Sequence, residues 1–98
     1  MVDVLGYRQV PPPPELAGLA RWFESDDGKQ IHLSEDPDHR PAAKAHVAVE
    51  VGGDLAAVEV KLEQQGIEQL ALDSDDRRTV FCKDPAGNTW ELRGNPRP

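Results

Sequence analysis

The chain has 98 residues, which allows one small domain with a modest hydrophobic core. It carries 11 basic against 18 acidic residues, a formal net charge of −7, which argues against binding to nucleic acid or to an anionic membrane surface. No apolar run is long enough to span a bilayer and no secretory leader opens the chain, so we expect a cytoplasmic protein. The single cysteine, Cys82, excludes an internal disulfide, and we interpret it as a small strand residue.

The first third of the chain predicts the end of a helix followed by three strands. Leu5 and Gly6 are typical of a last helical turn and its glycine stop. Four consecutive prolines follow and predict a stiff extended connection, although a ligand for a proline-recognition domain is the alternative interpretation. Strands are expected over residues 7–10, 20–24 and 29–34.

The remainder predicts the order strand, helix, strand, strand, strand. The strand pattern is cleanest over residues 45–51, where three valines alternate with His46, Ala48 and Glu50. Asp54 is a suitable N-cap for a helix over residues 55–65, and Gly66 is suited to end it. The apolar stripe of this helix comprises Leu55, Val58 and Leu62. A further strand is expected over residues 67–72, and the closing hairpin spans residues 80–93.

The closing hairpin places one carboxylate in the middle of a strand. Because side chains alternate along a strand, Trp90 and Leu92 are expected on one face, and Glu91 is expected on the other face with Thr89 and Arg93. The first third of the chain matches the later part of the second pattern, from the helix end onward. We therefore expect a degenerate repeat whose first copy lacks its opening strand and most of its helix.

Four segments together resemble the vicinal oxygen chelate superfamily, which includes glyoxalase I, bleomycin-resistance proteins, extradiol dioxygenases and fosfomycin-resistance transferases. They are Val-Leu-Gly-Tyr at 4–7, Gln-Ile-His-Leu at 30–33, Lys-Ala-His-Val-Ala-Val at 44–49 and Asp-Pro-Ala-Gly-Asn-Thr-Trp-Glu-Leu at 84–92. The resemblance implies an α+β fold of paired βαβββ modules that form a curved mixed sheet, with the first module incomplete. In these terms the chain is a single domain with an incomplete first module at 1–35, a linker at 36–44, a complete second module at 45–94 and a tail at 95–98.

The resemblance also implies a set of metal ligands. His32 matches the fourth-strand position of the first module, and His46 and Glu91 match the first- and fourth-strand positions of the second. The remaining ligand position lies upstream of Met1, which is interpreted as a possible internal methionine. Imidazole and carboxylate suit a divalent zinc, iron, nickel or manganese ion whose open positions take substrate oxygens. No general base stands out.

Structural interpretations of the same residues stay open. His32 suits a polar lining position, His46 a strand start bonded to backbone, and Glu91 an exposed strand charge. Glu50 shares a face with His46 but is interpreted as a solvated charge. His39 is interpreted as a surface residue of the linker. The aromatic residues Trp22, Phe23 and Phe81 are core residues or the wall of a ligand pocket.

Three functions are therefore compared: a metal-dependent lyase or dioxygenase, a metal-free small-molecule binder of bleomycin-resistance type, and an inactive assembly domain. The histidines at ligand positions favour the first, and the missing opening strand argues against present activity. The unpaired sheet edge predicts a homodimer, with elements exchanged between chains as one arrangement. The expected ligand is a small molecule, with no nucleic acid or membrane as partner.

Overall fold

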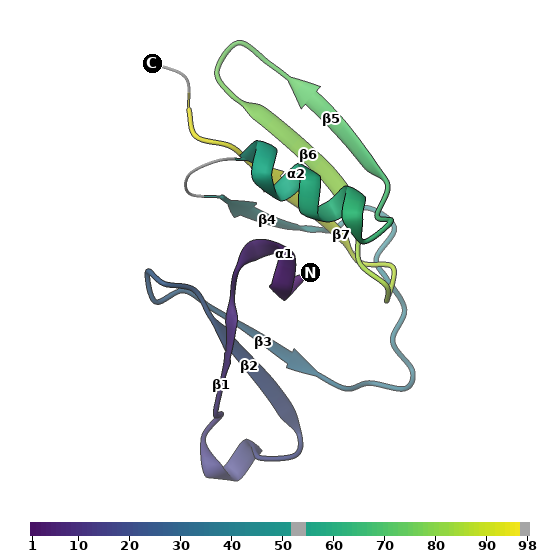
Figure 1. Cartoon of the computed structure of the whole chain (residues 1–98). Helices are drawn as coiled ribbons and strands as arrows, with labels where there is room; N and C mark the ends of the chain where they lie inside the picture. Colours follow the sequence, from purple (N-terminus) through teal and green to yellow (C-terminus); the bar gives the residue numbers. More distant parts are fainter. Residues whose placement is uncertain (52–54, 97–98) are drawn as a thin grey trace. The chain divides into compact units, whose positions relative to one another are not determined.

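The computed structural model describes residues 1–51 and 55–96 and has the expected α+β class (Figure 1). Its elements form two open curved sheets, one of three strands and one of four. The chain divides into two compact units, Met1–His39 and Arg40–Pro98, each described here by itself. Within the described residues, no helix is long and apolar enough to cross a membrane.

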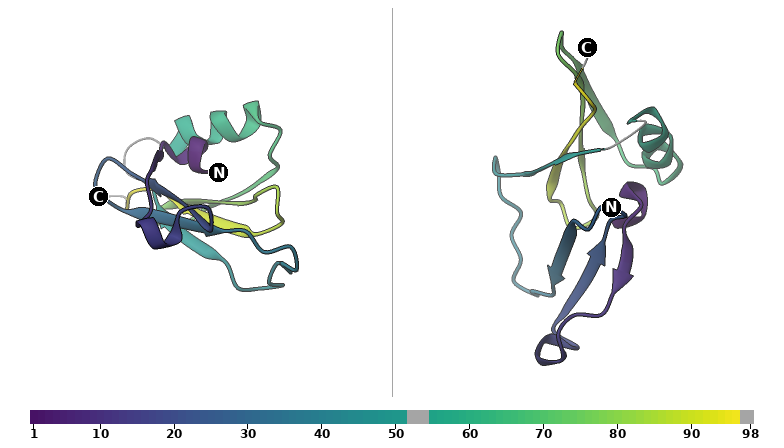
Figure 2. Two further views of the ribbon diagram at one scale, coloured as in Figure 1. Left: turned by 90° about the horizontal axis from the view of Figure 1, so that it is seen from below. Right: turned by 90° about the vertical axis from the view of Figure 1, so that its left-hand side faces the viewer.

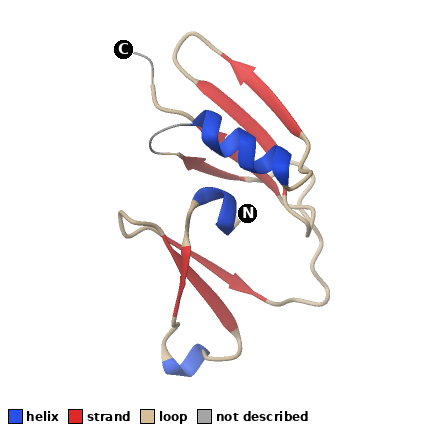
Figure 3. Ribbon diagram, viewed as in Figure 1, coloured by secondary structure: helices blue, strands red, loops and turns tan. Residues whose placement is uncertain are grey.

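The first unit is an antiparallel sheet preceded by one helical turn (Figure 3). Helix α1 (Val2–Leu5) ends at Gly6, whose φ of 77° is the left-handed conformation that glycine adopts without strain, as the sequence predicts. The strands β1 (Arg8–Val10), β2 (Ala20–Glu24) and β3 (Gln30–Ser34) pair in chain order. A short 3₁₀ turn, η1 (Pro14–Leu16), begins at the last of the four prolines, so the extended connection is shorter than expected.

The second unit has the predicted order strand, helix, strand, strand, strand. Its elements are β4 (Val47–Glu50), α2 (Leu55–Gln64), β5 (Gln69–Asp73), β6 (Arg78–Lys83) and β7 (Thr89–Arg93). The strand order is β4-β7-β6-β5, with β4 parallel to β7 and the other pairs antiparallel. The first strand therefore pairs with the last, which brings segments distant in sequence side by side.

Several boundaries in this unit differ from the sequence prediction by one or two residues. Strand β4 begins at Val47, so His46 lies just before the strand and not within it. This follows from its partner, because β7 begins at Thr89 directly after a turn and offers little backbone for pairing further upstream. Strand β5 begins at Gln69, two residues later than expected. The predicted N-cap Asp54 lies outside the described residues.

The core of the second unit lies between the sheet and α2, which covers one face of the strands (Figure 2). The predicted helix stripe is buried, and Leu62 is fully inaccessible. It is matched on the sheet by alternate residues of β6 and β7, namely Val80, Cys82, Trp90 and Leu92. The alternation predicted for the hairpin is therefore confirmed, and Glu91 belongs to the face opposite the helix.

Candidate functional site on the sheet face opposite α2

The strand register of the second unit places Glu91 at the centre of the uncovered face. Glu91 lies between Ala48 of β4 and Phe81 of β6, and Phe81 in turn pairs with Leu70 of β5. Phe81 is part-buried and Leu70 is 63% exposed. One carboxylate is thus framed by small and apolar side chains on the face of the sheet opposite α2.

His46 meets Glu91 directly, although the two residues are 45 positions apart in the sequence. Its Nε2 lies 3.0 Å from Glu91 Oε1, and its Nδ1 lies 3.0 Å from the backbone carbonyl oxygen of Lys44. The carbonyl of Lys44 therefore fixes the orientation of the ring and directs Nε2 towards the carboxylate. The two side chains are 34% and 20% exposed, so the pair is open to a ligand from solvent.

These contacts favour the protonated form of the imidazole. Both ring nitrogens face oxygen acceptors, and the imidazolium form of His46 can donate a proton to each of them. The hydrogen bond to the Lys44 carbonyl and then the bond to Glu91 raise the pKa of His46, and partial desolvation opposes them. When His46 is protonated, it forms an ion pair with Glu91.

Arg93 lies on the other side of the same carboxylate. Its Nε is 3.4 Å from Glu91 Oε2, while that buried nitrogen has no hydrogen-bond acceptor in the described part of the chain. The Arg93 side chain remains 37% exposed. Glu50, the register partner of Arg93 on β4, is instead paired with Arg77 at 3.2 Å. The interpretation of Glu50 as a largely solvated charge agrees with its 63% exposure.

The turn before β7 holds the strand that carries Glu91. Asp84 accepts hydrogen bonds from the backbone and side chain of Asn88 and from Trp90 Nε1, which lies 3.0 Å from Asp84 Oδ2. Burial alone would raise the pKa of Asp84, but these donors hold it below its usual value. The carboxylate of Asp84 therefore serves the turn and is not free to act as a ligand.

His32 lies in the first unit, on strand β3. It is the register partner of Trp22 on β2, and the two rings stack with centroids 3.6 Å apart and planes inclined by 6°. His32 Nε2 donates to Gln30 Oε1 at 2.9 Å. Of the three ligands predicted from the sequence, His46 and Glu91 are in contact within the second unit, whereas His32 belongs to the first unit.

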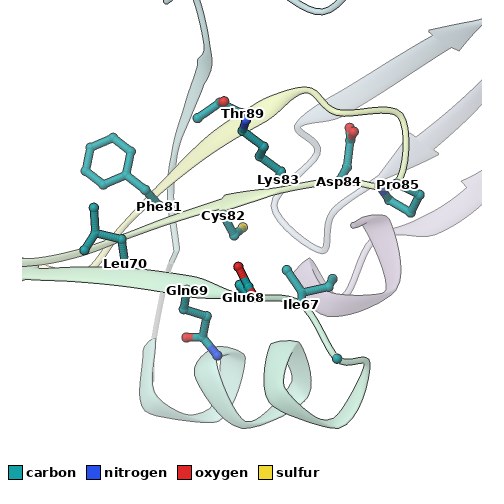
Figure 4. Close-up of a pocket in the computed structure, with 11 residues that line it drawn as sticks. Ile67, Glu68, Gln69, Leu70, Phe81, Cys82, Lys83, Asp84, Pro85 and Thr89 are labelled. Carbon is teal, nitrogen blue, oxygen red and sulfur yellow. The ribbon is translucent and has the colours of Figure 1, made fainter.

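A pocket of about 540 Å³ in the second unit is lined by residues of β5, β6 and the turn before β7, and its lining includes neither His46 nor Glu91. In Figure 4, Phe81, Leu70 and Thr89 lie on one side of the strands, and Cys82 and Gln69 lie on the side of the helix. Phe81 connects the pocket to the pair, because its ring meets the His46 ring edge-on at a centroid distance of 5.9 Å. Burial raises the pKa of the Cys82 thiol, which keeps it protonated and unreactive.

Within the described residues, no group of three or more His, Cys, Asp and Glu side chains is placed to hold a metal ion. His46 and Glu91 supply two donors, and a metal would need further ligands from elsewhere. Arg93 was not predicted from the sequence as a member of this site, although alternation on the closing strand placed it on the face of Glu91. The interpretation of His46 as a residue at a strand start bonded to backbone is confirmed by its contact with the carbonyl of Lys44.

The fold has counterparts among solved structures. No family model and no curated protein matches the sequence. A Bacillus anthracis protein assigned to the glyoxalase family is 28% identical, with a TM-score of 0.80 over 95% of this chain and 76% of that one. The fosfomycin resistance protein FosX of Listeria monocytogenes is 12% identical, with a TM-score of 0.73 over 96% and 77%. A glyoxalase/dioxygenase from Nostoc punctiforme is 21% identical, with a TM-score of 0.71 over 98% and 79%. The chain therefore has the fold of the vicinal oxygen chelate superfamily, which glyoxalases, dioxygenases and fosfomycin-resistance proteins share.

Proposed function

We propose that this chain binds a divalent metal ion through His46 and Glu91 and presents it to a small substrate that carries two adjacent oxygens, as in a glyoxalase or dioxygenase. The observation that supports this most strongly is the orientation of His46. Metal-binding histidines commonly donate their second ring nitrogen to a backbone carbonyl, which fixes the ring and leaves the other nitrogen for the metal. His46 has this arrangement, with Nδ1 on Lys44 and Nε2 beside Glu91.

The donor set fits the proposed ion. An imidazole nitrogen and a carboxylate oxygen suit zinc, iron, nickel or manganese, and 3.0 Å between them allows both to bind one ion after a small separation. His32 is proposed as the third ligand because it matches a ligand position of the family that the chain resembles. When bound, the ion would supply Lewis-acid chemistry and polarise a substrate oxygen. This chain's own residues orient the ring, through Lys44, and shield one side of the site, through Phe81.

A metal-free small-molecule binder of bleomycin-resistance type is the second candidate. The pocket in the second unit supports it, because its volume is within the range of small-molecule sites and it is lined in part by Leu70 and by Phe81, whose ring contacts His46. In this case the His46–Glu91 ion pair would be the resting state of the site and not a precursor of a metal complex.

Equilibrium dialysis against Co²⁺ and Zn²⁺, followed by elemental analysis, tests the two candidates. The wild type should retain about one metal ion per site, and His46→Gln and Glu91→Gln should each weaken uptake by about tenfold or more, since each removes a direct ligand. His39→Gln is the matched control, because it removes an exposed histidine at the end of the first unit. If the wild type takes up no metal, or if His39→Gln lowers uptake as much as His46→Gln, the metal proposal fails.

A further inference from the structure

We propose that the outer edge of strand β5 pairs with β5 of a second copy of this chain, in antiparallel orientation about a two-fold axis at Ala71. The two four-stranded sheets would then continue into each other across this edge. This edge is distinct from that of the incomplete first module, on which the sequence-based expectation of a homodimer rests.

The exposure of β5 carries the first step. β5 is an outer strand in the order β4-β7-β6-β5, so one side of its backbone has no partner among the described strands. All five of its residues are exposed, and Leu70 and Leu72 are exposed by 63% and 52%. The opposite outer strand, β4, exposes Val47 by 49%. The apolar surface at the margins of this sheet is therefore concentrated along β5.

β5 also lacks the features by which edge strands usually avoid pairing. Such strands are commonly interrupted by proline or by a bulge, or they carry lysine. The sequence of β5 is Gln-Leu-Ala-Leu-Asp, with neither proline nor lysine. Its pairing with β6 is unbroken from Gln69 to Asp73, so no bulge bends the edge away. The outer backbone groups of β5 thus form a regular template for another strand.

The sequence of β5 is complementary to itself when the strand is reversed. With Ala71 opposite Ala71 of the second copy, each Leu70 lies opposite a Leu72 and each Gln69 lies opposite an Asp73. Opposite residues of an antiparallel pair share a face, so the leucines of both copies would lie together on the sheet face opposite α2. The polar pairs set an amide donor against a carboxylate. This register therefore joins apolar to apolar side chains and brings no like charges together within the strand.

Shifted registers lose this match. Because side chains alternate along a strand, a shift must be of two residues if the same face of both copies is to stay on one side. In one direction Leu72 would lie opposite Glu68, and in the other Leu70 would lie opposite Ser74. Each shift sets leucine against a polar side chain, so the register centred on Ala71 is favoured.

The pairing also has a consequence for the pocket of the second unit. Leu70 lines that pocket, and in the proposed register Leu72 of the second copy would lie directly opposite Leu70. The second copy would then add an apolar side chain to the wall of a small-molecule pocket.

Charge exchange at the two-fold axis tests the register. Ala71 is exposed, so Ala71→Lys and Ala71→Glu should both fold, which far-ultraviolet circular dichroism checks. Each variant sets like charges opposite each other and should weaken the dimer by about tenfold or more, measured by light scattering over a dilution series. An equal mixture of the two variants should recover a dimer with one copy of each, identified by native mass spectrometry. Ala71→Gln, the uncharged control, should dimerise within about twofold of the wild type.

Cysteine cross-linking gives a second, independent measurement. Ala71→Cys should form a disulfide-linked dimer under mild oxidation, because opposite Cα atoms of an antiparallel pair are about 5 Å apart, within reach of a disulfide. Asp73→Cys is the control, since its two copies would lie about 14 Å apart in the same register and should not cross-link. The native Cys82 is buried and should not take part.

The outcomes separate the pairing from other modes of association. A monomeric wild type overturns the proposal. A wild-type dimer that Ala71→Lys and Ala71→Glu leave intact also overturns it, because another surface would then hold the dimer. Charged variants that stay monomeric when mixed, or equal cross-linking at positions 71 and 73, overturn the register centred on Ala71.

Discussion

Asp84 accepts a hydrogen bond from the indole of Trp90 at 3.0 Å, and this contact ties the turn to the strand that carries Glu91. Trp90 itself is buried on the helix side of the sheet, so the bond also fixes a large core residue. The orientation of the site thus depends on a carboxylate that does not belong to it.

Asp84→Ala should destabilise the protein by about 1–3 kcal/mol, because it leaves the Trp90 indole and the Asn88 amides without their acceptor. Urea unfolding at neutral pH measures this loss. Since the folded-state pKa of Asp84 lies below its ordinary value of 3.8, its contribution is present above that pH and disappears as the pH falls further. In Asp84→Asn this acid-dependent component should be missing, and an unchanged pH profile would contradict the assignment.

The imidazole of His46 should titrate above its ordinary pKa of 6.5 in the metal-free protein, because the Lys44 carbonyl and Glu91 both stabilise its charge. Its stabilising contribution is therefore full below pH 6.5 and is lost as the pH rises through the higher folded-state pKa. NMR titration of the ring protons, assigned with His46→Gln, measures this value. Glu91→Gln should lower the pKa, and no change in that variant would argue against the ion pair.

Leu62→Ala should cost about 2–5 kcal/mol in unfolding free energy, since Leu62 is fully buried and its removal leaves a cavity under the sheet. Val60→Ala, on the same helix but 52% exposed, should cost less than about 1 kcal/mol and serves as the control. Thermal or urea unfolding followed by far-ultraviolet circular dichroism compares the two. Similar losses in both variants would contradict the placement of α2 on the sheet.

The chain should behave as a homodimer. Strand β5 lies at an edge of its sheet and exposes Leu70 and Leu72 by 63% and 52%, an apolar surface that favours coverage. Light scattering should give twice the chain mass of 10.8 kDa. The double variant Leu70→Lys, Leu72→Lys should shift the mass towards the monomer. A monomeric wild type at high concentration would refute the expectation.

Much of the second unit could be predicted from the sequence because its signals are local. The alternation in residues 89–93 and the helix stripe at Leu55, Val58 and Leu62 each follow from a single period of the backbone. The contact between His46 and Glu91 is different, since it depends on parallel pairing of two strands far apart in the chain. Composition and spacing carry no information on that pairing, and only the resemblance of the segments suggested it.

The remaining members of the site are set by side-chain geometry. The alternation placed Arg93 on the correct face. Its contact with Glu91 could not be predicted, because Glu50 was an equally suitable partner and is instead paired with Arg77. The orientation of His46 depends on a carbonyl two residues earlier, which any residue type would supply. The role of His32 as a third ligand stays a prediction.

The pairing of β4 with β7 also has a consequence for how the site is made during synthesis. Among the described strands of this sheet, β4 pairs with β7 alone, so its backbone cannot form these bonds until β7 has left the ribosome. His46 is translated early in this unit but reaches Glu91 only at the end, after helix α2 and the β5–β6 hairpin. Folding of this unit therefore ends with closure of a non-local strand pair, a step that topology makes slow. A function at this site therefore becomes possible only after the other elements of this unit have folded.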